Sequence, residues 1–178
     1  MRRALGVDGP AWTAENLARH AHSVARSLIR VDADEVTYPL HIILRHRLEV
    51  ALLSGDLSLA DLPGAWNELH EELIGIRPPD DADGCLQDIH WMGGSFGYFP
   101  TYTLGAIAAA QLFEAAEAAG EVRAPLARGD FRPLLAWLRE NVHRHGRLPG
   151  GAEALLTRAT GRSFDVATFR RHLEARYG

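Results

Sequence analysis

The sequence predicts an all-α protein with at most one short strand. Three observations support this fold class. Apolar residues recur at helical spacing in most segments, glycine or proline marks many of their ends, and strict alternation of apolar and polar residues is rare. Only residues 27–33, SLIRVDA, alternate well enough to pair as an edge strand. Because 178 residues of which 47% are hydrophobic can bury a sizeable core, we expect residues 1–178 to form a single helical domain.

The first three helices are predicted in the N-terminal half of the chain. One runs from residue 13 or 14 to residue 27, and a second covers residues 33–53. Gly55 can end the second helix, and Pro39 either lies in its first turn or kinks it. Pro63 suits the first turn of a third helix that ends near Gly75. Residues 77–84, RPPDDADG, then form a polar loop.

An alanine-rich helix from Pro100 to Ala119 is expected to be the most buried element. It is almost uniformly apolar and carries few charges before Glu114. Further helices are predicted over residues 131–145, 152–160 and 166–177. Gly146 follows the first of these three, and Asp165 is a candidate N-cap for the last.

Composition excludes several classes of partner and site. A net charge of −4 with interspersed signs gives no reason to expect a nucleic acid or an anionic membrane as partner. Cys85 is the only cysteine, which rules out an internal disulfide and a thiolate zinc cluster and fits a reducing cytoplasm. Residues 1–10 lack the apolar segment of a signal peptide, and no run approaches the roughly 20 apolar residues that span a bilayer. We therefore expect a cytoplasmic protein.

Arg30, Asp32 and Asp34 form the first polar motif, within IRVDADEVTY. In an extended segment these three side chains would share one face, and the arginine could bind a ligand carboxylate through two hydrogen bonds. Alternatively, Asp34 caps a helix and Arg30 belongs to a structural ion pair.

The second motif is the stretch GCLQDIHWMGGSFGYFPTYTLG, residues 84–105. If its first residues are helical, Gln87 and His90 share a face while Asp88 points elsewhere. His90 could then donate a hydrogen bond to a developing oxyanion. The alternative is that His90 and Trp91 pack a corner where the two glycines bend the chain.

Three further side chains are candidates for binding. Tyr98 and Tyr102 are four residues apart near the start of the alanine-rich helix, so their hydroxyls could donate to one oxyanion or belong to the core. Arg147 lies in GRLPGG, where glycine geometry could direct it at a ligand, or where it interacts with a helix C-terminus. By contrast, HEELI is not a zinc motif, because Ile74 replaces the second histidine of HExxH.

Taken together, these segments resemble the C-terminal part of the carboxypeptidase Taq family of zinc metallocarboxypeptidases. The resemblance covers most of the chain from about residue 27, and its motifs I-R-x-x-A-D and G-x-x-Q-D-x-H-W are matched at residues 29–34 and 84–91. A third segment, HRHGRLPGGAEALLTRATG, occurs in the family's order. The resemblance implies a largely helical fold with an active-site groove.

The resemblance also implies roles for eight residues. Arg30 and Arg147 would bind the C-terminal carboxylate of a peptide, with Tyr98 beside them, and His90 and Tyr102 would hold the scissile carbonyl oxygen. Asp34, Gln87 and Asp88 would orient these groups. We expect Arg30, His90, Tyr102 and Arg147 to converge on one cleft.

The departure from the family lies in the zinc site. The HExxH helix and the third zinc ligand of the family precede I-R-x-x-A-D, whereas this chain has 29 residues before Arg30. Zinc activates the attacking water and polarises the carbonyl, so we expect a truncated metallocarboxypeptidase-like protein that binds no zinc or other cofactor and is inactive alone. The alternatives are half of a split zinc carboxypeptidase that needs an HExxH-bearing chain, or a module that binds peptide C-termini. An exposed half-groove also predicts a homo-oligomer or a docked N-terminal lobe.

Overall fold

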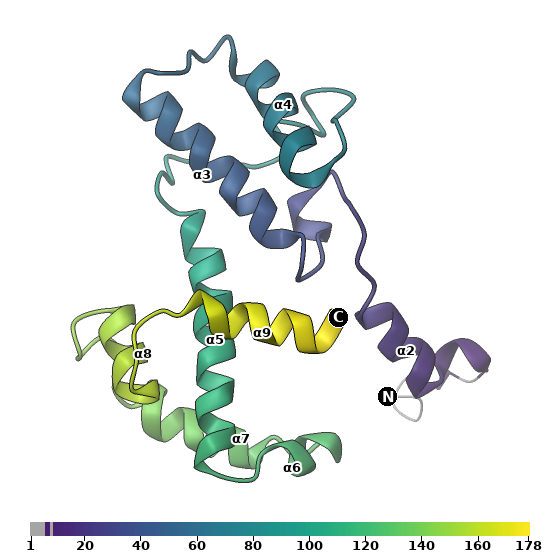
Figure 1. Cartoon of the computed structure of the whole chain (residues 1–178), viewed down its shortest axis with the longest axis vertical. Coiled ribbons are helices and arrows are strands. Elements are labelled where there is room, and N and C mark those ends of the chain that lie inside the picture. Colours follow the sequence, from purple (N-terminus) through teal and green to yellow (C-terminus); the bar gives the residue numbers. More distant parts are fainter. Residues whose placement is uncertain (1–5, 8) are drawn as a thin grey trace. The chain divides into compact units, whose positions relative to one another are not determined.

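The computed structural model of the chain describes residues 6, 7 and 9–178. Every regular element in these ranges is a helix, and none is a strand, which confirms the predicted all-α class (Figure 1). The elements are η1 (Pro10–Trp12), α2 (Ala14–Ala21), η2 (Arg30–Asp32), α3 (Tyr38–Ser54), α4 (Leu62–Ile74), α5 (Pro100–Ala119), α6 (Arg123–Ala127), α7 (Arg132–Leu138), η3 (Arg139–His143), α8 (Ala152–Thr160) and α9 (Val166–Tyr177). Residues 1–5 and 8, which carry most of the sequence judged for a signal peptide, lie outside the described residues.

Local chemistry explains most helix boundaries. Pro39 lies in the first turn of α3 and does not kink it. Gly55 and Gly75 end α3 and α4 in the left-handed conformation, with φ of 84° and 82°, a conformation that costs glycine little. Asp165 caps α9, because its Oδ1 accepts a hydrogen bond from the Ala167 backbone N–H at 2.9 Å.

The segment between α2 and α3 differs from the prediction. The helix α2 ends at Ala21 rather than at residue 27, and the backbone N–H of Ala25 donates to Asp34 Oδ2 at 2.9 Å. In a longer helix the Ala25 N–H would donate to a backbone carbonyl oxygen. Here it donates to the Asp34 carboxylate instead. Residues 27–33, the one segment that could have paired as an edge strand, form no strand, and Arg30–Asp32 is a 3₁₀ turn.

The helix predicted over residues 131–145 is divided into two geometries. The α-helical part, α7, spans Arg132–Leu138, and the π-helix η3 follows directly. Asn141 Nδ2 donates to the Trp137 carbonyl oxygen at 2.9 Å, and the Arg144 N–H donates five residues back, to the Arg139 carbonyl oxygen, at 3.1 Å. Competition from a side-chain donor is a recognised cause of such a local change in helical register.

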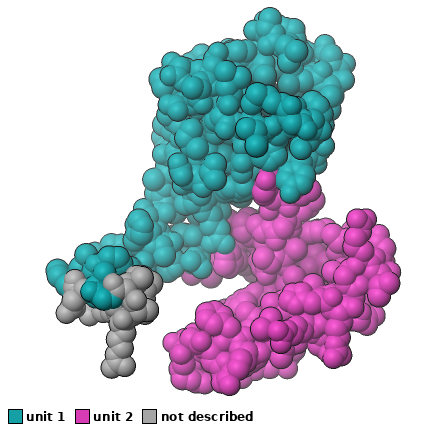
Figure 2. Space-filling model, turned by 180° about the vertical axis from the view of Figure 1, so that it is seen from behind, with its two compact units in different colours: residues 1–100, 176–178 teal, residues 101–175 magenta. Residues whose placement is uncertain are grey.

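The chain divides into two compact units, residues 1–100 with 176–178 and residues 101–175 (Figure 2). In unit 1, α3 and α4 lie side by side (Figure 1). Leu44, Leu48, Trp66 and Cys85 form its buried apolar cluster. That the chain forms a single domain, with both units unfolding together, stays a prediction.

The most buried helix is α3, so the prediction that α5 would be is wrong. Six side chains of α3 are buried, namely His41, Ile42, Leu44, Arg45, Leu48 and Glu49. The buried residues of α5 are Ile107, Gln111 and Ala116. Alanine makes a helix apolar but gives it little side-chain area to bury, whereas the larger residues of α3 fill the interface with α4.

A buried amide organises unit 2. Gln111 on α5 has 0% exposure, donates from Nε2 to the Ser163 carbonyl oxygen at 2.9 Å, and accepts from the Asp165 N–H at 2.9 Å. Gln111 therefore holds the turn that leads into α9.

None of the helices in residues 6–7 and 9–178 combines the length and hydrophobicity that a bilayer-spanning segment requires.

Candidate functional site: the Asp88 cluster

Asp88 lies between two arginines in unit 1. Arg30 donates to Asp88 Oδ1 from Nη2 at 2.7 Å and from Nε at 3.2 Å, and Arg45 donates from Nε to Asp88 Oδ2. The Arg45 side chain is fully buried, and those of Arg30 and Asp88 are 9% and 11% exposed. We call Arg30, Arg45, Gln87, Asp88 and His90 the Asp88 cluster.

Gln87 joins the two arginines from a second direction. Its Oε1 accepts from Arg45 Nη2 at 2.7 Å and from the Arg30 backbone N–H at 3.0 Å. Its Nε2 donates to the carbonyl oxygens of Leu28 and Asp83, at 3.1 and 2.9 Å. Every hydrogen-bonding group of this amide has a partner, so Gln87 fixes the segment around Arg30 against the turn that carries Asp88.

The start of residues 84–105 is not helical, so the condition under which Gln87 and His90 would share a helix face is not met. These residues form consecutive turns, in which the N–H of Leu86 donates to the Asp81 carbonyl oxygen and that of Gln87 to the Gly84 carbonyl oxygen. Asp88 consequently does not point away from Gln87. Both side chains accept from Arg30 and Arg45, because the turns follow the positions of these cations rather than a helical repeat.

Aromatic rings surround the two cations. The guanidinium carbon of Arg45 lies 4.7 Å from the ring centre of Trp66 and 5.6 Å from that of Phe99. Arg30 donates from Nη1 to the Tyr38 hydroxyl at 2.7 Å and lies 5.7 Å from the centre of that ring. Such contacts stabilise a cation that has lost its hydration.

The charges of the cluster depend on one another. Burial alone would raise the pKa of Asp88, but the hydrogen bonds and charges of Arg30 and Arg45 lower it below its usual value. Burial lowers the pKa of Arg45 to about 10 despite Asp88, whereas for Arg30 the contacts with Asp88 and Tyr38 outweigh burial and raise the pKa. All three groups are therefore ionised at neutral pH.

His90 lies at the edge of the cluster. Its Nδ1 is 3.6 Å from Asp88 Oδ1, and its ring centre is 4.5 Å from that of Phe99 and 5.7 Å from that of Tyr98. A nearby carboxylate favours a proton on Nδ1. Tyr98 precedes α5, which begins at Pro100, so the premise that Tyr98 and Tyr102 share a helix is wrong.

Two of the sequence-predicted residues belong to unit 2. Tyr102 is half-buried on α5, and Arg147 is exposed in a turn where the Gly150 N–H donates to the Arg147 carbonyl oxygen at 3.0 Å. The Arg147 side chain makes no hydrogen bond or ion pair with any residue that the structure describes. It borders a cavity of about 510 Å³, lined by Val142, His143, Gly146, Arg147, Gly151, Ala152 and Leu155. Because Arg30 and His90 belong to unit 1, the convergence of the four residues on one cleft stays a prediction.

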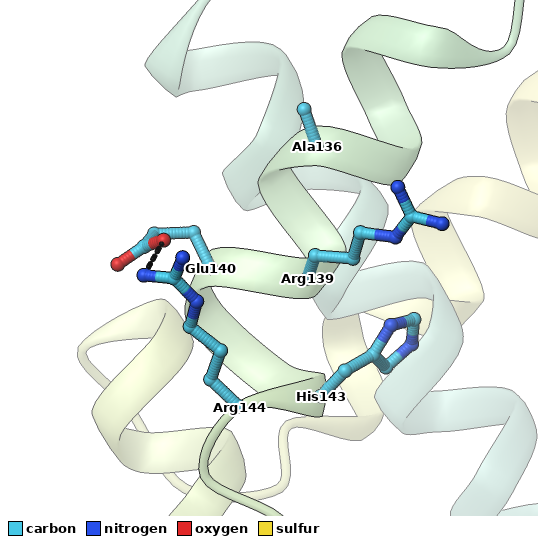
Figure 3. A pocket seen from close by; sticks show the side chains of 5 residues that line it. All are labelled: Ala136, Arg139, Glu140, His143 and Arg144. Atoms are coloured by element: carbon cyan, nitrogen blue, oxygen red, sulfur yellow. Dashed lines mark ion pairs between the residues drawn. The ribbon is translucent and has the colours of Figure 1, made fainter.

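A second hollow of unit 2, of about 500 Å³, lies over α7 and η3 (Figure 3). Its lining comes from one stretch of helix, and Arg144 forms an ion pair with Glu140 at 2.7 Å. The polar side chains Arg139, Glu140, His143 and Arg144 are all exposed. This hollow is an open, charged helix face rather than an enclosed site.

Asp34 caps the entry to α3, as the second interpretation of its motif predicted. Its Oδ1 accepts from the backbone N–H groups of Val36 and Thr37, each at 2.9 Å, immediately before α3. Burial would raise the pKa of Asp34, but these bonds and the one from Ala25 lower it. The shared face proposed for Arg30, Asp32 and Asp34 is wrong, because their backbone is not extended.

Sequence reasoning missed Arg45, the most buried member of the cluster, and Glu49. The Glu49 carboxylate accepts from Trp91 Nε1 at 2.6 Å and from the Gly97 N–H, which fixes the turns that carry His90. A signal was present, because His41, Arg45 and Glu49 recur every four residues along α3. Polar residues at that spacing share one face, and here that face is buried.

The zinc ion that the family resemblance implies has no ligand set among the described residues. In residues 6–7 and 9–178, no three His, Cys, Asp or Glu side chains are grouped so that they could hold a metal ion. In the HEELI segment, His70 and Ile74 are buried, and the His70 ring bonds to the Ile76 carbonyl oxygen at 2.7 Å. The described residues therefore do not fit a zinc ion.

Comparison with known proteins identifies the family. The profile of the carboxypeptidase Taq (M32) metallopeptidases matches residues 1–177. The chain belongs to this family. It is 48% identical over 157 residues to thermostable carboxypeptidase 1 of Thermus thermophilus, and this alignment covers 88% of the chain and 31% of the relative. Carboxypeptidase 1 of Bacillus subtilis is 43% identical over 164 residues, covering 92% of the chain and 32% of that protein.

Solved structures of M32 proteins have the same fold. Metallocarboxypeptidase 1 of Trypanosoma cruzi superposes with a TM-score of 0.90 at 42% identity, over 96% of this chain and 36% of that one. The M32 carboxypeptidase of Deinococcus radiodurans superposes with a TM-score of 0.89 at 44% identity, over 99% of this chain and 35% of that one. The chain thus spans about a third of the length of the relatives it matches.

Proposed function

We propose that this chain supplies the carboxylate-binding and oxyanion-binding side of an M32 carboxypeptidase groove and releases no C-terminal residues by itself. The observation that carries the proposal is the family match over residues 1–177, which includes both the I-R-x-x-A-D and the G-x-x-Q-D-x-H-W motif. The sequence contains no HExxH, and the named relatives are about three times as long. In this proposal the chain holds the groups that recognise a peptide but lacks the groups that activate water.

In the proposed groove, His90 and Tyr102 donate to the oxyanion. The Asp88 carboxylate, whose Oδ1 is 3.6 Å from His90 Nδ1, places a negative charge beside the ring, and the arginines on its other side keep it ionised. Oriented donors of this kind stabilise a tetrahedral oxyanion without reorganising during the reaction. Gln87 and Asp34 contribute indirectly, by fixing the backbone on either side of Arg30.

Arg147 is the proposed direct ligand of the peptide carboxylate. Its guanidinium is exposed, and the adjoining cavity can take atoms of the substrate. Arg30 already donates to both Asp88 and Tyr38, so its main proposed contribution is to hold Asp88 in place. Tyr98, which is half exposed beside His90, remains a candidate contact for the peptide.

An exposed apolar surface supports docking as a second element of the proposal. Leu53, Leu59, Leu86, Met92 and Phe96 are 51% to 78% exposed, and they line a cavity of about 430 Å³ in unit 1. Surfaces of this kind recruit partners. We propose that an HExxH-bearing lobe or chain covers this surface and completes a zinc carboxypeptidase, and that the isolated chain otherwise self-associates. The single cysteine supports a cytoplasmic location.

Two measurements test the proposal. Tag-free chain is assayed for release of phenylalanine from an N-acylated dipeptide, with and without added Zn²⁺ or Co²⁺, and no release is expected. Binding of the same peptide and of its C-terminal amide is then followed by NMR, and the carboxylate form should bind more tightly.

Arg147→Gln should abolish that difference, while Arg144→Gln, an exposed arginine paired with Glu140, should preserve it. Metal-dependent release by the chain alone would refute the inactive assignment. Equal binding of acid and amide would refute the carboxylate site. Sedimentation of a monodisperse monomer at high concentration would count against self-association.

A further inference from the structure

The α3–α4 interface contains a layer of buried polar groups that the proposed function does not use. We call Thr37, His41, Trp66 and His70 the polar layer. Their exposed fractions are 8%, 0%, 1% and 0%. Four of their polar atoms have no hydrogen-bond partner among the described residues, namely His41 Nδ1 and Nε2, Trp66 Nε1 and His70 Nε2.

Contacts between α3 and α4 place these groups together. The ring centres of His41 and His70 are 5.5 Å apart and meet edge to face. Arg45 lies one turn after His41 on α3, and Trp66 lies one turn before His70 on α4. The guanidinium carbon of Arg45 is 4.7 Å from the ring centre of Trp66. Trp66 precedes His70 by one turn, so the unpaired atoms of His41, Trp66 and His70 come from adjacent turns of two packed helices.

Leaving such atoms unpaired is costly. A buried donor or acceptor without a partner loses its hydration and gains no bond in return, and native proteins usually pair such groups with internal water. The polar layer therefore requires a bound species that the side chains themselves do not supply.

The hydrogen-bonding pattern restricts the chemistry of that species. His70 Nδ1 must donate to the Ile76 carbonyl oxygen, at 2.7 Å, so neutral His70 presents an Nε2 lone pair that can only accept. Trp66 Nε1–H can only donate. Neutral His41 offers one donor and one acceptor. The bound species must therefore accept and donate at the same time.

A cation does not meet this requirement. It would take the lone pairs of the histidines but could not accept from the Trp66 indole N–H. The fully buried guanidinium of Arg45 lies against Trp66 and also donates to the His41 carbonyl oxygen at 2.8 Å, so the surroundings are already positive. A water molecule can accept two hydrogen bonds and donate two.

We propose that the α3–α4 pair encloses a structural water site, in which water accepts from Trp66 Nε1–H and donates to His70 Nε2, with His41 as a further partner. The site lies one turn from Arg45 on both helices. It thereby supports the hairpin that presents this arginine to Asp88, and it does so whether or not the chain binds peptides.

The proposal is tested by NMR on the complete chain, labelled with ¹⁵N, at pH 7.5. Long-range ¹H–¹⁵N correlation should show neutral His70 protonated on Nδ1. The Trp66 indole proton should show a dipolar cross-peak to water with the sign of a long-lived contact. Trp91 is the matched control within the molecule, because its indole donates to Glu49 at 2.6 Å and should show no such peak.

Trp66→Phe should delete the cross-peak, and Trp91→Phe should leave it. If Trp66→Phe does not fold, assignment through the wild-type backbone identifies the same signal. Absence of a water contact at the Trp66 indole, or His70 protonated on Nε2, would overturn the proposal. So would retention of one equivalent of added Zn²⁺ after dialysis that His70→Gln abolishes, because the site would then hold a metal.

Discussion

His41 should make the stability of unit 1 depend on pH between neutrality and pH 4. Its ring has 0% exposure and adjoins His70. Burial, followed by the charges of Arg45, His70 and Arg30, lowers the pKa of His41 from 6.5 to about 4, and Asp88 opposes these effects. Protonating this ring in the folded protein would add a buried charge to an already positive region.

The sign and size follow from linkage. Because the folded-state pKa lies below the unfolded-state value, the unfolded chain binds more protons between about pH 4 and pH 6.5. The contribution of His41 is therefore complete above pH 6.5 and is lost as the pH falls through this window. With a pKa of about 4 against 6.5, the loss is about 2 kcal/mol at pH 5 and about 3 kcal/mol at pH 4.

Urea unfolding at pH 7.5 and pH 5, followed by tryptophan fluorescence, measures this loss. The free energy of unfolding should fall from pH 7.5 to pH 5 in the wild type. In His41→Gln this fall should be about 2 kcal/mol smaller. His46→Gln is the control, because His46 is an exposed histidine on the same helix, and it should retain the wild-type dependence. Carboxylates such as Asp88 titrate in all three proteins and cancel in the comparison.

Equal pH dependence in the wild type and His41→Gln would refute the reasoning. A second measurement does not depend on the variant folding. The ring-proton shifts of His41 in the wild type, followed from pH 7.5 downward, should change near pH 4. A midpoint near 6.5 would show that the ring reaches bulk solvent when it is protonated.

Three further predictions concern side chains and helix ends. Asp88→Asn should lower the free energy of urea unfolding by about 3–5 kcal/mol, because it leaves two buried arginines without their counter-ion, whereas Asp32→Asn, at an exposed position, should change it little. Glu49→Gln should cost about 1–3 kcal/mol by weakening its bonds to an indole and a backbone N–H, and an unchanged urea midpoint would contradict those bonds. Gly75→Ala should destabilise by about 1 kcal/mol, because φ is 82° there. Gly64→Ala, within α4 and facing open space, should stabilise by about 0.5–1 kcal/mol, and the same sign for both glycines would refute the conformational argument.

The helices were predictable wherever their ends depend on adjacent residues. Pro63 and Gly75 bracket α4, and Pro39 and Gly55 mark α3, because proline restricts φ in a first turn and glycine tolerates the left-handed conformation at a C-terminus. The prediction failed where a distant group intervenes. The carboxylate of Asp34 takes the N–H of Ala25 and ends the first helix early, and no local pattern reveals that contact.

The candidate site was predictable in its residue types but not in its geometry. Gln87, Asp88 and His90 stand out because three polar groups precede a glycine turn, and the family motif gives them roles. If the segment were helical, Asp88 would point away from Gln87. The structure joins them through Arg45, which is 43 residues before Asp88. A salt bridge between such distant positions depends on how α3 and the turns pack, and the spacing of residues along the chain does not predict it.

By itself the sequence determined the helical class, most helix ends, the family and the polar residues available for binding, because these depend on local backbone preferences and on motifs. Only the tertiary structure decided which polar residues are buried and which charges meet. Packing α3 against α4 encloses His41 and Arg45, lowers the pKa of both, and gives α3 more buried side chains than the alanine-rich α5. Burial and electrostatic energy depend on distances in space, and those distances exist only once the helices have packed.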